Sequence, residues 1–315
     1  MNSQSIAVEI KNLVKRFGDF VAVDNVSLTV KRGEIFGFLG SNGAGKTTTI
    51  RMLCGLLTPT GGSARVGGFD LATQAEQIKQ TIGYMSQKFS LYDDLSVVEN
   101  IDFFSGVYNV PHALRRSRKE YVLRMSGLEN RGNTMTRLLP AGWKQRLALG
   151  CAILHQPPTL FLDEPTSGVD PIARRSFWDL IYELSAAGHT VFVTTHYMDE
   201  AEYCHRLALM HRGRLIGLGP ARELKAALVS HTFMHLESTD VLESLRALEQ
   251  NEGVVEAAVF GSGLHLTVRD PAAAERLVRK LLTDRGIGIK RLAVIEPSME
   301  DVFVAMIEQE ERKAS

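Results

Sequence analysis

The sequence contains few of the features that mark specialised protein classes. It has three cysteines among 315 residues, and these are far apart: Cys54, Cys151 and Cys204. An odd number at such spacing argues against a disulfide framework and against the paired thiolates of a structural zinc site. It favours a reducing compartment. The histidines offer no set at metal-ligand spacing either.

Long apolar runs are absent as well. No stretch reaches the ~18 uninterrupted apolar residues that a membrane-spanning helix needs. Residues 1–7 lack the basic segment and the apolar run of a secretion signal. We therefore expect a cytosolic chain that does not cross a bilayer by itself.

A net charge is also missing. Lys and Arg number 36, Asp and Glu number 36, and the formal net charge at pH 7 is zero. Charge therefore gives no support for a nucleic-acid partner. The hydrophobic share of 44% and the charged share of 23% are those of an ordinary globular protein, and the length suggests about two domains.

The first two-thirds of the chain alternates between strand and helix patterns. Residues 8–10 and 22–30 have the β-branched patterns of strands, and residues 34–40 form the nearly continuous apolar run of a strand inside a parallel sheet. Helical spacing follows from Thr47, with Pro59 as the expected stop. Further buried strands are predicted at residues 159–162, 190–194 and 206–210, and a helical insertion at about residues 88–146.

Glycines and Pro220 cluster near residues 213–223, where we place a domain boundary. The predicted domains are residues 1–221 and 222–315. The second has the order of a small α+β domain of the split βαβ, ferredoxin-like type. Its predicted strands are 232–236, 254–260, 264–268 and 289–295, and its predicted helices are 242–250, 272–284 and 298–310.

A phosphate-binding motif lies between the buried strand at 34–40 and the helix after it. Residues 40–47 read Gly-Ser-Asn-Gly-Ala-Gly-Lys-Thr and fit G-x-x-x-x-G-K-[ST] in the strand–turn–helix context that the motif requires. Glycines let backbone N–H groups converge on phosphate oxygens, and the helix N-terminus adds the positive end of its dipole. We expect Lys46 to reach the β- and γ-phosphates and the Thr47 hydroxyl to bind Mg²⁺.

A second motif ends the predicted strand at 159–162. Residues 160–164 read Leu-Phe-Leu-Asp-Glu, so the strand delivers two adjacent carboxylates. Asp163 is predicted to hold Mg²⁺ through its coordination shell. Glu164 is predicted to act on the water that attacks the γ-phosphate.

Together with other segments in the same order, these motifs resemble the nucleotide-binding domain of an ATP-binding cassette (ABC) transporter. The residues that carry the likeness are 40–48, Gln87, 138–146, 160–165, 167–170 and His196. The likeness spans residues 8–224. It implies an α/β P-loop NTPase core of the RecA-like type with an antiparallel β subdomain and a helical insertion.

The resemblance also implies residue roles. Phe17 would stack on adenine, and His196 would hydrogen-bond the γ-phosphate. Gln87 would contact Mg²⁺ and the attacking water, and it would communicate the state of the site to a membrane subunit. Asp170 would lie where two such domains meet. The resulting nucleotide-binding residues are Phe17, Gly40, Asn42, Gly43, Ala44, Gly45, Lys46, Thr47 and Thr48. The catalytic residues are Glu164, His196 and Gln87, the Mg²⁺ residues are Thr47, Gln87 and Asp163, and the cofactors are ATP and Mg²⁺.

The signature segment departs from the family pattern. In place of Leu-Ser-Gly-Gly-Gln, residues 139–143 read Leu-Pro-Ala-Gly-Trp. In the family this segment starts a helix that clamps the γ-phosphate of the opposite subunit. Pro140 cannot donate a hydrogen bond, whereas the amides of Ala141, Gly142 and Trp143 and the helix dipole remain. We expect Ala141 and Gly142 to act on the nucleotide of a second subunit.

Three functions are compatible with the resemblance. Residues 296–303 resemble the ending of ATPase subunits of the exporter branch that works with separate type-2 permeases, although a capped helix start explains them too. The first hypothesis is therefore an ATPase subunit that pairs with a second copy or a paralogue. It would power a separate membrane permease at the cytoplasmic face of the inner or plasma membrane, exporting drugs or other small hydrophobic molecules. The alternatives are a soluble ABC ATPase acting on nucleic acid or ribosomes, and a weakly hydrolysing scaffold.

Overall fold

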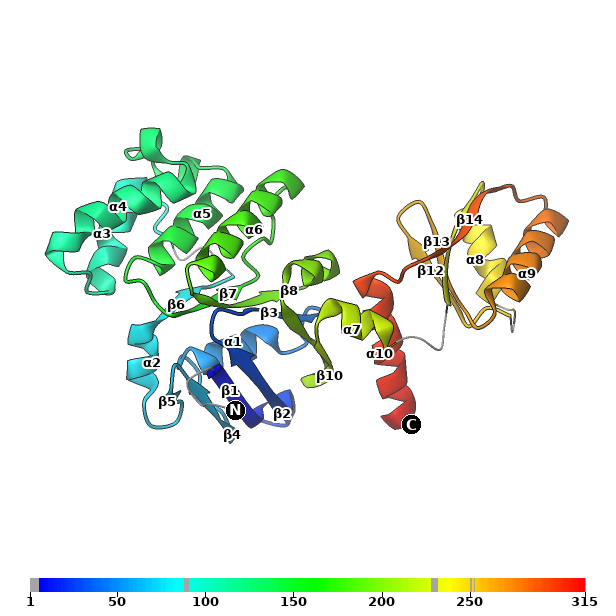
Figure 1. The fold of residues 1–315 in the computed structure, drawn as a ribbon, viewed down its shortest axis with the longest axis horizontal. Helices are drawn as coiled ribbons and strands as arrows, with labels where there is room; N and C mark the ends of the chain where they lie inside the picture. Colours follow the sequence, from blue (N-terminus) through cyan, green and yellow to red (C-terminus); the bar gives the residue numbers. More distant parts are fainter. Residues whose placement is uncertain (1–5, 88–90, 228–231, 250, 252, 315) are drawn as a thin grey trace. The chain divides into compact units, whose positions relative to one another are not determined.

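The computed structural model describes residues 6–87, 91–227, 232–249, 251 and 253–314 (Figure 1). The chain forms two compact units, Met1–Ala221 and Arg222–Ser315. Within the described ranges, no helix is both long and apolar enough to span a membrane.

The main sheet of the first unit has the strand order β10-β9-β3-β8-β7-β6. Its members are β3 (Ile35–Gly40), β6 (Ile82–Met85), β7 (Thr159–Asp163), β8 (Thr190–Thr195), β9 (Arg206–His211) and β10 (Arg214–Gly219). Neighbouring strands are parallel except β9 and β10. Every residue of β3, β7 and β8 is buried, which accounts for their nearly continuous apolar sequences. The carboxyl ends of these three strands meet at one edge of the sheet.

A second, antiparallel sheet has the order β2-β1-β4-β5. It consists of β1 (Ile6–Phe17), β2 (Phe20–Lys31), β4 (Gly61–Val66) and β5 (Phe69–Asp70). Its apolar side chains form one core with the helix α1 (Lys46–Leu53) and with Phe36, Phe161 and Phe192 of the main sheet. The predicted α/β core with an antiparallel β subdomain is confirmed.

The remaining helices of the first unit include the predicted insertion. They are α2 (Ala75–Thr81), α3 (Val97–Val107), α4 (His112–Ser126), α5 (Ala141–Ala152) and α6 (Pro171–Ala186), with short 3₁₀ turns at Glu129–Arg131, Thr136–Leu138 and Met198–Tyr203. Helix α7 (Ala221–Ala226) begins at the last residue of this unit. Helices α3, α4 and α5 share a core that includes Val97, Val122 and Leu147. Residues 88–90 of the predicted insertion lie outside the described residues.

Helix α1 is shorter than predicted. Helical spacing predicts that the helix continues until Pro59 stops it, but α1 ends at Leu53. Gly55 has a left-handed φ of 70°. Its N–H bonds Met52 O at 2.8 Å, and Leu56 N–H bonds Arg51 O at 2.9 Å. This pair of bonds is a Schellman motif, so a glycine and not the later proline ends the helix.

The second unit is a four-stranded antiparallel sheet with the order β12-β13-β11-β14. Its elements are β11 (Thr232–Ser238), α8 (Val241–Glu249), β12 (Glu256–Phe260), β13 (Gly263–Val268), α9 (Pro271–Asp284), β14 (Ile289–Ile295) and α10 (Met299–Ala314). The order βαββαβ with the first strand between the third and fourth is that of the predicted split βαβ fold. One sheet face packs on α8 and α9 through side chains such as Leu236, Leu264 and Val278.

The three cysteines are unpaired and buried in the first unit. Burial raises the pKa of each thiol above its usual value. These thiols remain protonated and pack as small apolar side chains.

Candidate nucleotide-binding site

The phosphate loop leaves β3 at Gly40 and enters α1 at Lys46. A side chain on Gly40 would collide with the carbonyl of Met210, and one on Gly45 would collide with the carbonyl of Ala22. Gly45, with a φ of 106°, is also the N-cap of α1. The loop can therefore follow this path only with glycine at both positions.

A cavity of about 410 Å³ opens over this loop. Its lining residues come from the loop, from the start of β2 and from two segments distant in sequence. They are Phe20, Ala22, Asn42, Gly43, Ala44, Gly45, Lys46, Thr47, Thr48, Gln87 and Glu164. The phosphate-loop residues after Ser41 thus line a single cavity together with Gln87 and Glu164.

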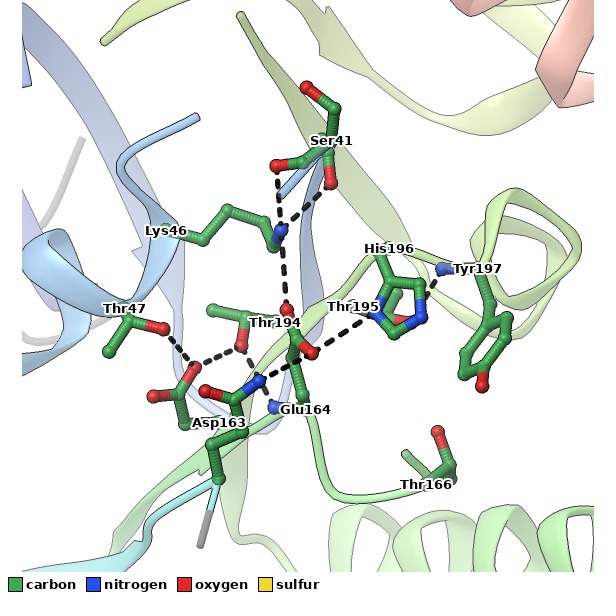
Figure 2. Close-up of polar contacts among 12 residues, drawn as sticks. Ser41, Lys46, Thr47, Asp163, Glu164, Thr166, Thr194, Thr195, His196 and Tyr197 are labelled. Carbon is green, nitrogen blue, oxygen red and sulfur yellow. Dashed lines mark hydrogen bonds and ion pairs between the residues drawn. The ribbon is translucent and has the colours of Figure 1, made fainter. Parts of the chain in front are cut away.

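The buried Lys46 side chain lies at the inner end of the loop. Its Nζ donates to Gly40 O at 2.8 Å and to Ser41 O at 3.1 Å, and it lies 3.3 Å from Glu164 Oε1 (Figure 2). Burial lowers the pKa of Lys46 from its usual value, while the Glu164 and Asp163 carboxylates act in the opposite direction. The ammonium group is thus held by acceptors at the place where phosphate oxygens are predicted.

Asp163 ends β7 beside two threonine hydroxyls. Its Oδ1 accepts from Thr47 Oγ1 at 3.1 Å and from Thr194 Oγ1 at 2.7 Å. Its Oδ2 is buried and has no hydrogen-bond partner among the described residues. Burial raises the pKa of Asp163. An unpartnered carboxylate oxygen next to the Thr47 hydroxyl fits a hard divalent cation such as Mg²⁺.

Glu164 is the centre of the polar network. Its backbone has a left-handed φ of 49°, and its N–H bonds both the carbonyl and the hydroxyl of Thr194, at 3.1 and 3.0 Å. Its Oε2 accepts from Gln87 Nε2 at 3.0 Å. The same oxygen lies 3.0 Å from His196 Nδ1 (Figure 2). The fold brings together three residues, Gln87, Glu164 and His196, that are far apart in the sequence.

Two phenylalanines lie at the turn between β1 and β2. Phe17 and Phe20 are register partners, and both are exposed, at 50% and 64%. Phe20 lines the cavity, whereas Phe17 is outside its lining and carries Lys15 Nζ 5.0 Å from its ring centroid. Phe20 was not predicted from the sequence, although a second aromatic residue three positions after Phe17 is a visible signal.

The signature segment starts α5 and is absent from the described lining of this cavity. Pro140 is the N-cap of α5, and its carbonyl accepts the N–H of Trp143 at 3.1 Å. The Trp143 amide, predicted to be available for phosphate, is therefore already bonded. A side chain on Gly142 would lie 2.8 Å from the Ala173 Cβ, so the first turns of α5 and α6 are in close contact.

Asp170 caps α6. Its Oδ1 accepts from the N–H groups of Ile172 and Ala173 at 3.1 and 3.0 Å. Helix capping is therefore a sufficient reason for an aspartate at position 170 within a single chain. Its predicted position between two domains stays a prediction.

A buried network that the sequence did not indicate lies beneath the start of α6. Thr166 Oγ1 donates to Glu200 Oε1 at 2.7 Å, and both residues are almost fully buried. The Arg174 guanidinium lies 3.8 Å from Glu200 Oε1 and 3.8 Å from the ring centroid of Tyr197. The Tyr197 and His196 rings are 4.1 Å apart. Contacts thus run from α6 to the histidine beside Glu164.

Comparisons with known proteins cover both units. Residues 23–167 match the ABC transporter family model, and residues 219–307 match the C-terminal domain of ATP-binding proteins like DrrA1-3. The chain is 54% identical to the probable multidrug ABC transporter ATP-binding protein YbhF of Escherichia coli over 70% of its own length. It spans only 38% of the length of that relative.

Other relatives match over nearly their whole length. The linearmycin resistance ATP-binding protein LnrL of Bacillus subtilis is 33% identical, with 94% of this chain and 97% of LnrL covered. The daunorubicin/doxorubicin resistance ATP-binding protein DrrA of Streptomyces peucetius is also 33% identical, with 97% and 94% covered. Among solved structures, the dimeric ATP-binding cassette MJ0796 with ADP and Pi is 27% identical with a TM-score of 0.62, and 68% of this chain and 98% of that chain are covered.

Proposed function

The chain belongs to the ABC transporter family of ATP-binding proteins, and from this premise we propose that it hydrolyses ATP to drive export through a separate membrane permease. The observation that carries the proposal is the position of Glu164. Its carboxylate lies between Lys46, Gln87 and His196 and next to Asp163. The multidrug, linearmycin and daunorubicin/doxorubicin functions in the relatives' names support drugs or other small hydrophobic molecules as the exported class.

In this proposal, each residue of the network has a role in ATP binding or hydrolysis. The glycine loop and the start of α1 supply N–H donors to the phosphates, and Lys46 adds a positive charge at the β- and γ-phosphates. Thr47 and Asp163 would hold Mg²⁺, which supplies charge neutralisation on those phosphates when bound. Glu164 accepts the proton of the attacking water, Gln87 orients that water, and His196 hydrogen-bonds the γ-phosphate.

The signature segment supports a role for a second subunit at the same site. Because Ala141 and Gly142 are outside the cavity lining of their own chain, we propose that they contact the nucleotide of a second copy or a paralogue. The MJ0796 cassette, described as a dimer, supports this arrangement. The dimer would enclose two ATP molecules.

An exposed aromatic patch on the insertion is the proposed permease contact. Tyr92, Phe103 and Val107 are 49%, 41% and 53% exposed, and the Tyr92 and Phe103 rings meet edge to face at 4.7 Å. Exposed apolar groups of this kind mark interaction surfaces. The patch begins five residues after Gln87, so permease contact and the catalytic network are close in the chain. Contact with the permease would keep the protein at the cytoplasmic face of the membrane.

The catalytic assignment is tested by Glu164→Gln with Glu183→Gln, on the exposed side of α6, as the matched control. Glu164→Gln removes the proton acceptor and keeps the phosphate loop, so ATP binding should persist. Loss of a general base lowers rates roughly 10²- to 10⁴-fold. Single-turnover hydrolysis and calorimetric ATP binding measure the two quantities. Hydrolysis by Glu164→Gln within a few fold of the parent protein would refute the assignment, and an inactive parent would favour the scaffold alternative.

The transporter assignment is tested by fractionation. We expect the chain to sediment with membranes when its permease is present and to stay in the supernatant otherwise. The variant Phe103→Ser should reduce this association, whereas Ser117→Ala on the exposed face of α4 should not. Sedimentation with ribosomes or nucleic acid in place of membranes would favour the other class of ABC ATPase.

A further inference from the structure

The sheet of the second unit has a second face that α8 and α9 do not use. Met234 and Leu236 of β11 and Leu264 of β13 point to the core with α8 and α9. Side chains alternate along a strand, so Phe233 and His265 lie on the opposite face. There the His265 ring contacts Asp301 at the start of α10.

A cavity of about 510 Å³ lies on this opposite face. Ligand pockets for small molecules typically measure about 300 to 1,000 Å³. The lining comes from β11, β12, β13 and α10 and consists of Phe233, Glu256, Ala258, Val259, Phe260, Gly261, His265, Thr267, Glu300, Asp301 and Val304. Its walls are largely apolar and aromatic, and its polar members include three carboxylates and one histidine.

The histidine side of the cavity is fixed by hydrogen bonds. His265 Nδ1 lies 2.9 and 3.1 Å from the two carboxylate oxygens of Asp301. Asp301 Oδ2 also accepts from the N–H and the hydroxyl of Ser298, both at 2.7 Å. The Phe260 ring stacks on the His265 ring at a centroid distance of 3.9 Å and an angle of 15°. The aromatic wall therefore has a defined position before any ligand binds, which lowers the entropic cost of binding.

The side chain of Glu256 differs from that of Asp301 in having no hydrogen bond and no ion pair among the described residues. It is half-buried on β12, and its pKa is raised by burial and by the nearby Glu308 and Asp301 carboxylates, with Arg312 acting weakly in the opposite direction. A positive charge placed in the cavity would relieve this repulsion. An anion would increase it.

Metal ions are a poor fit to these groups. No cluster of three or more His, Cys, Asp or Glu side chains with metal-binding geometry is found in the described parts of the chain. The aromatic wall instead favours a cation with an apolar body, since ring faces attract positive charge.

We propose that this cavity binds an organic monocation, with its charge beside Glu256 and its apolar body against Phe260 and Phe233. The site lies wholly in the second unit and shares no residue with the nucleotide cavity. The proposed cation site does not depend on the proposed transport function. The second unit would then bind a ligand of its own, separate from the ATP bound by the first unit.

Two ions of nearly equal shape and opposite charge test the proposal on the full chain. Tetraphenylphosphonium carries four phenyl groups and a positive charge, and tetraphenylborate carries the same groups and a negative charge. Equilibrium dialysis should show saturable binding of tetraphenylphosphonium at one site per chain and at least roughly tenfold weaker binding of tetraphenylborate. Equal binding of the two ions, or no saturable binding of the cation, would overturn the proposal.

Variants locate the site. Glu256→Gln should weaken tetraphenylphosphonium binding about 5- to 30-fold, and the matched Glu249→Gln exchange at the exposed end of α8 should leave it unchanged. Phe260→Leu keeps an apolar side chain and removes the ring face, so it should weaken binding by several fold. Thermal melting confirms that each variant is folded. Equal affinities for the parent, Glu256→Gln and Phe260→Leu proteins would place the cation elsewhere and refute the site.

A competition experiment distinguishes a small molecule from a basic protein segment as the occupant of the cavity. A lysine-rich peptide that displaces tetraphenylphosphonium only from proteins with an intact Glu256 would identify a basic protein segment as the occupant and would overturn the small-molecule assignment. Lys46→Ala should leave cation binding unchanged, which keeps this test separate from ATP binding.

Discussion

Helices α1 and α5 of the first unit both begin without a side-chain cap, and they differ in the residue that stands at the cap position. Helix α1 begins after Gly45, whose left-handed φ of 106° directs the first turn toward a cavity in its own chain. Helix α5 begins after Pro140, with a φ of −55° and a ψ of 151°, and lies outside that cavity. The α1 site is built within one chain, whereas the start of α5 gains its proposed ligand only from a second chain.

Among the variants that test this comparison, the largest change in ATP affinity is expected at the start of α1. Gly45→Ala requires an unfavourable φ and a collision of Cβ with the Ala22 carbonyl. The combined strain should lower ATP affinity by about 100-fold or more. Gly43→Ala is the matched control, because Gly43 has a φ of 80° but nothing within 4 Å of an added Cβ. Its effect should be about tenfold at most. Calorimetry of ATP binding measures both, and equal losses would contradict the steric argument.

At α5 we expect a gain. Pro140→Ser adds a hydroxyl donor where the resemblance places a phosphate of the opposite subunit. A hydrogen bond to a charged group contributes about 1.5 to 3 kcal/mol, or roughly 10- to 150-fold in dimer association. Proline's restriction of the unfolded chain acts in the opposite direction by up to ~1 kcal/mol, so the hydrogen bond decides the sign.

Sedimentation of the Glu164→Gln protein with ATP and Mg²⁺, with and without Pro140→Ser, measures this gain. Pro111→Ser is the control, because Pro111 is also the N-cap of a helix, α4. Its dimerisation should not change. Equal or weaker dimerisation of the Pro140→Ser protein would mean that the α5 amides already satisfy the phosphate or that the subunits meet differently.

The smallest effect is expected for contacts with the base of ATP, which can be measured separately from contacts with its phosphates. Phe17→Ala and Phe20→Ala should each lower ATP affinity about five- to tenfold, at the lower end of stacking contributions because both rings are at least half exposed. Tripolyphosphate affinity should stay unchanged, since no base is present. A parallel loss of tripolyphosphate binding would show that the β1–β2 turn, and not base stacking, supports the loop.

The phosphate loop and the β7 carboxylates were predictable because each is a contiguous segment with its own local context. The sequence predicts Phe17 as the stacking ring and gives no role to Phe20, because the register of the β1–β2 turn decides which ring lines the cavity. The Thr166–Glu200 hydrogen bond was also beyond sequence reasoning. It joins residues that come together only through the order of β7 and β8 in the sheet.

The end of α1 has a signal in the sequence that apolar spacing hides. Gly55 is a typical helix-ending residue, yet the helical spacing continues to Leu57 and predicts a stop at Pro59. Apolar spacing cannot place a helix end, since residues after the end also pack into the core. In the second unit, strand and helix order was readable from periodicity. The cavity was not, because it depends on which strand residues face α10.

The buried thiols make this chain suitable for site-specific labelling. Alkylation requires an accessible thiolate, and Cys54, Cys151 and Cys204 are enclosed in the core and protonated. A cysteine introduced at an exposed position such as Ile172, which is 82% exposed in the first turn of α6, would react alone in the native protein. A fluorophore there would report subunit association without removal of any native residue.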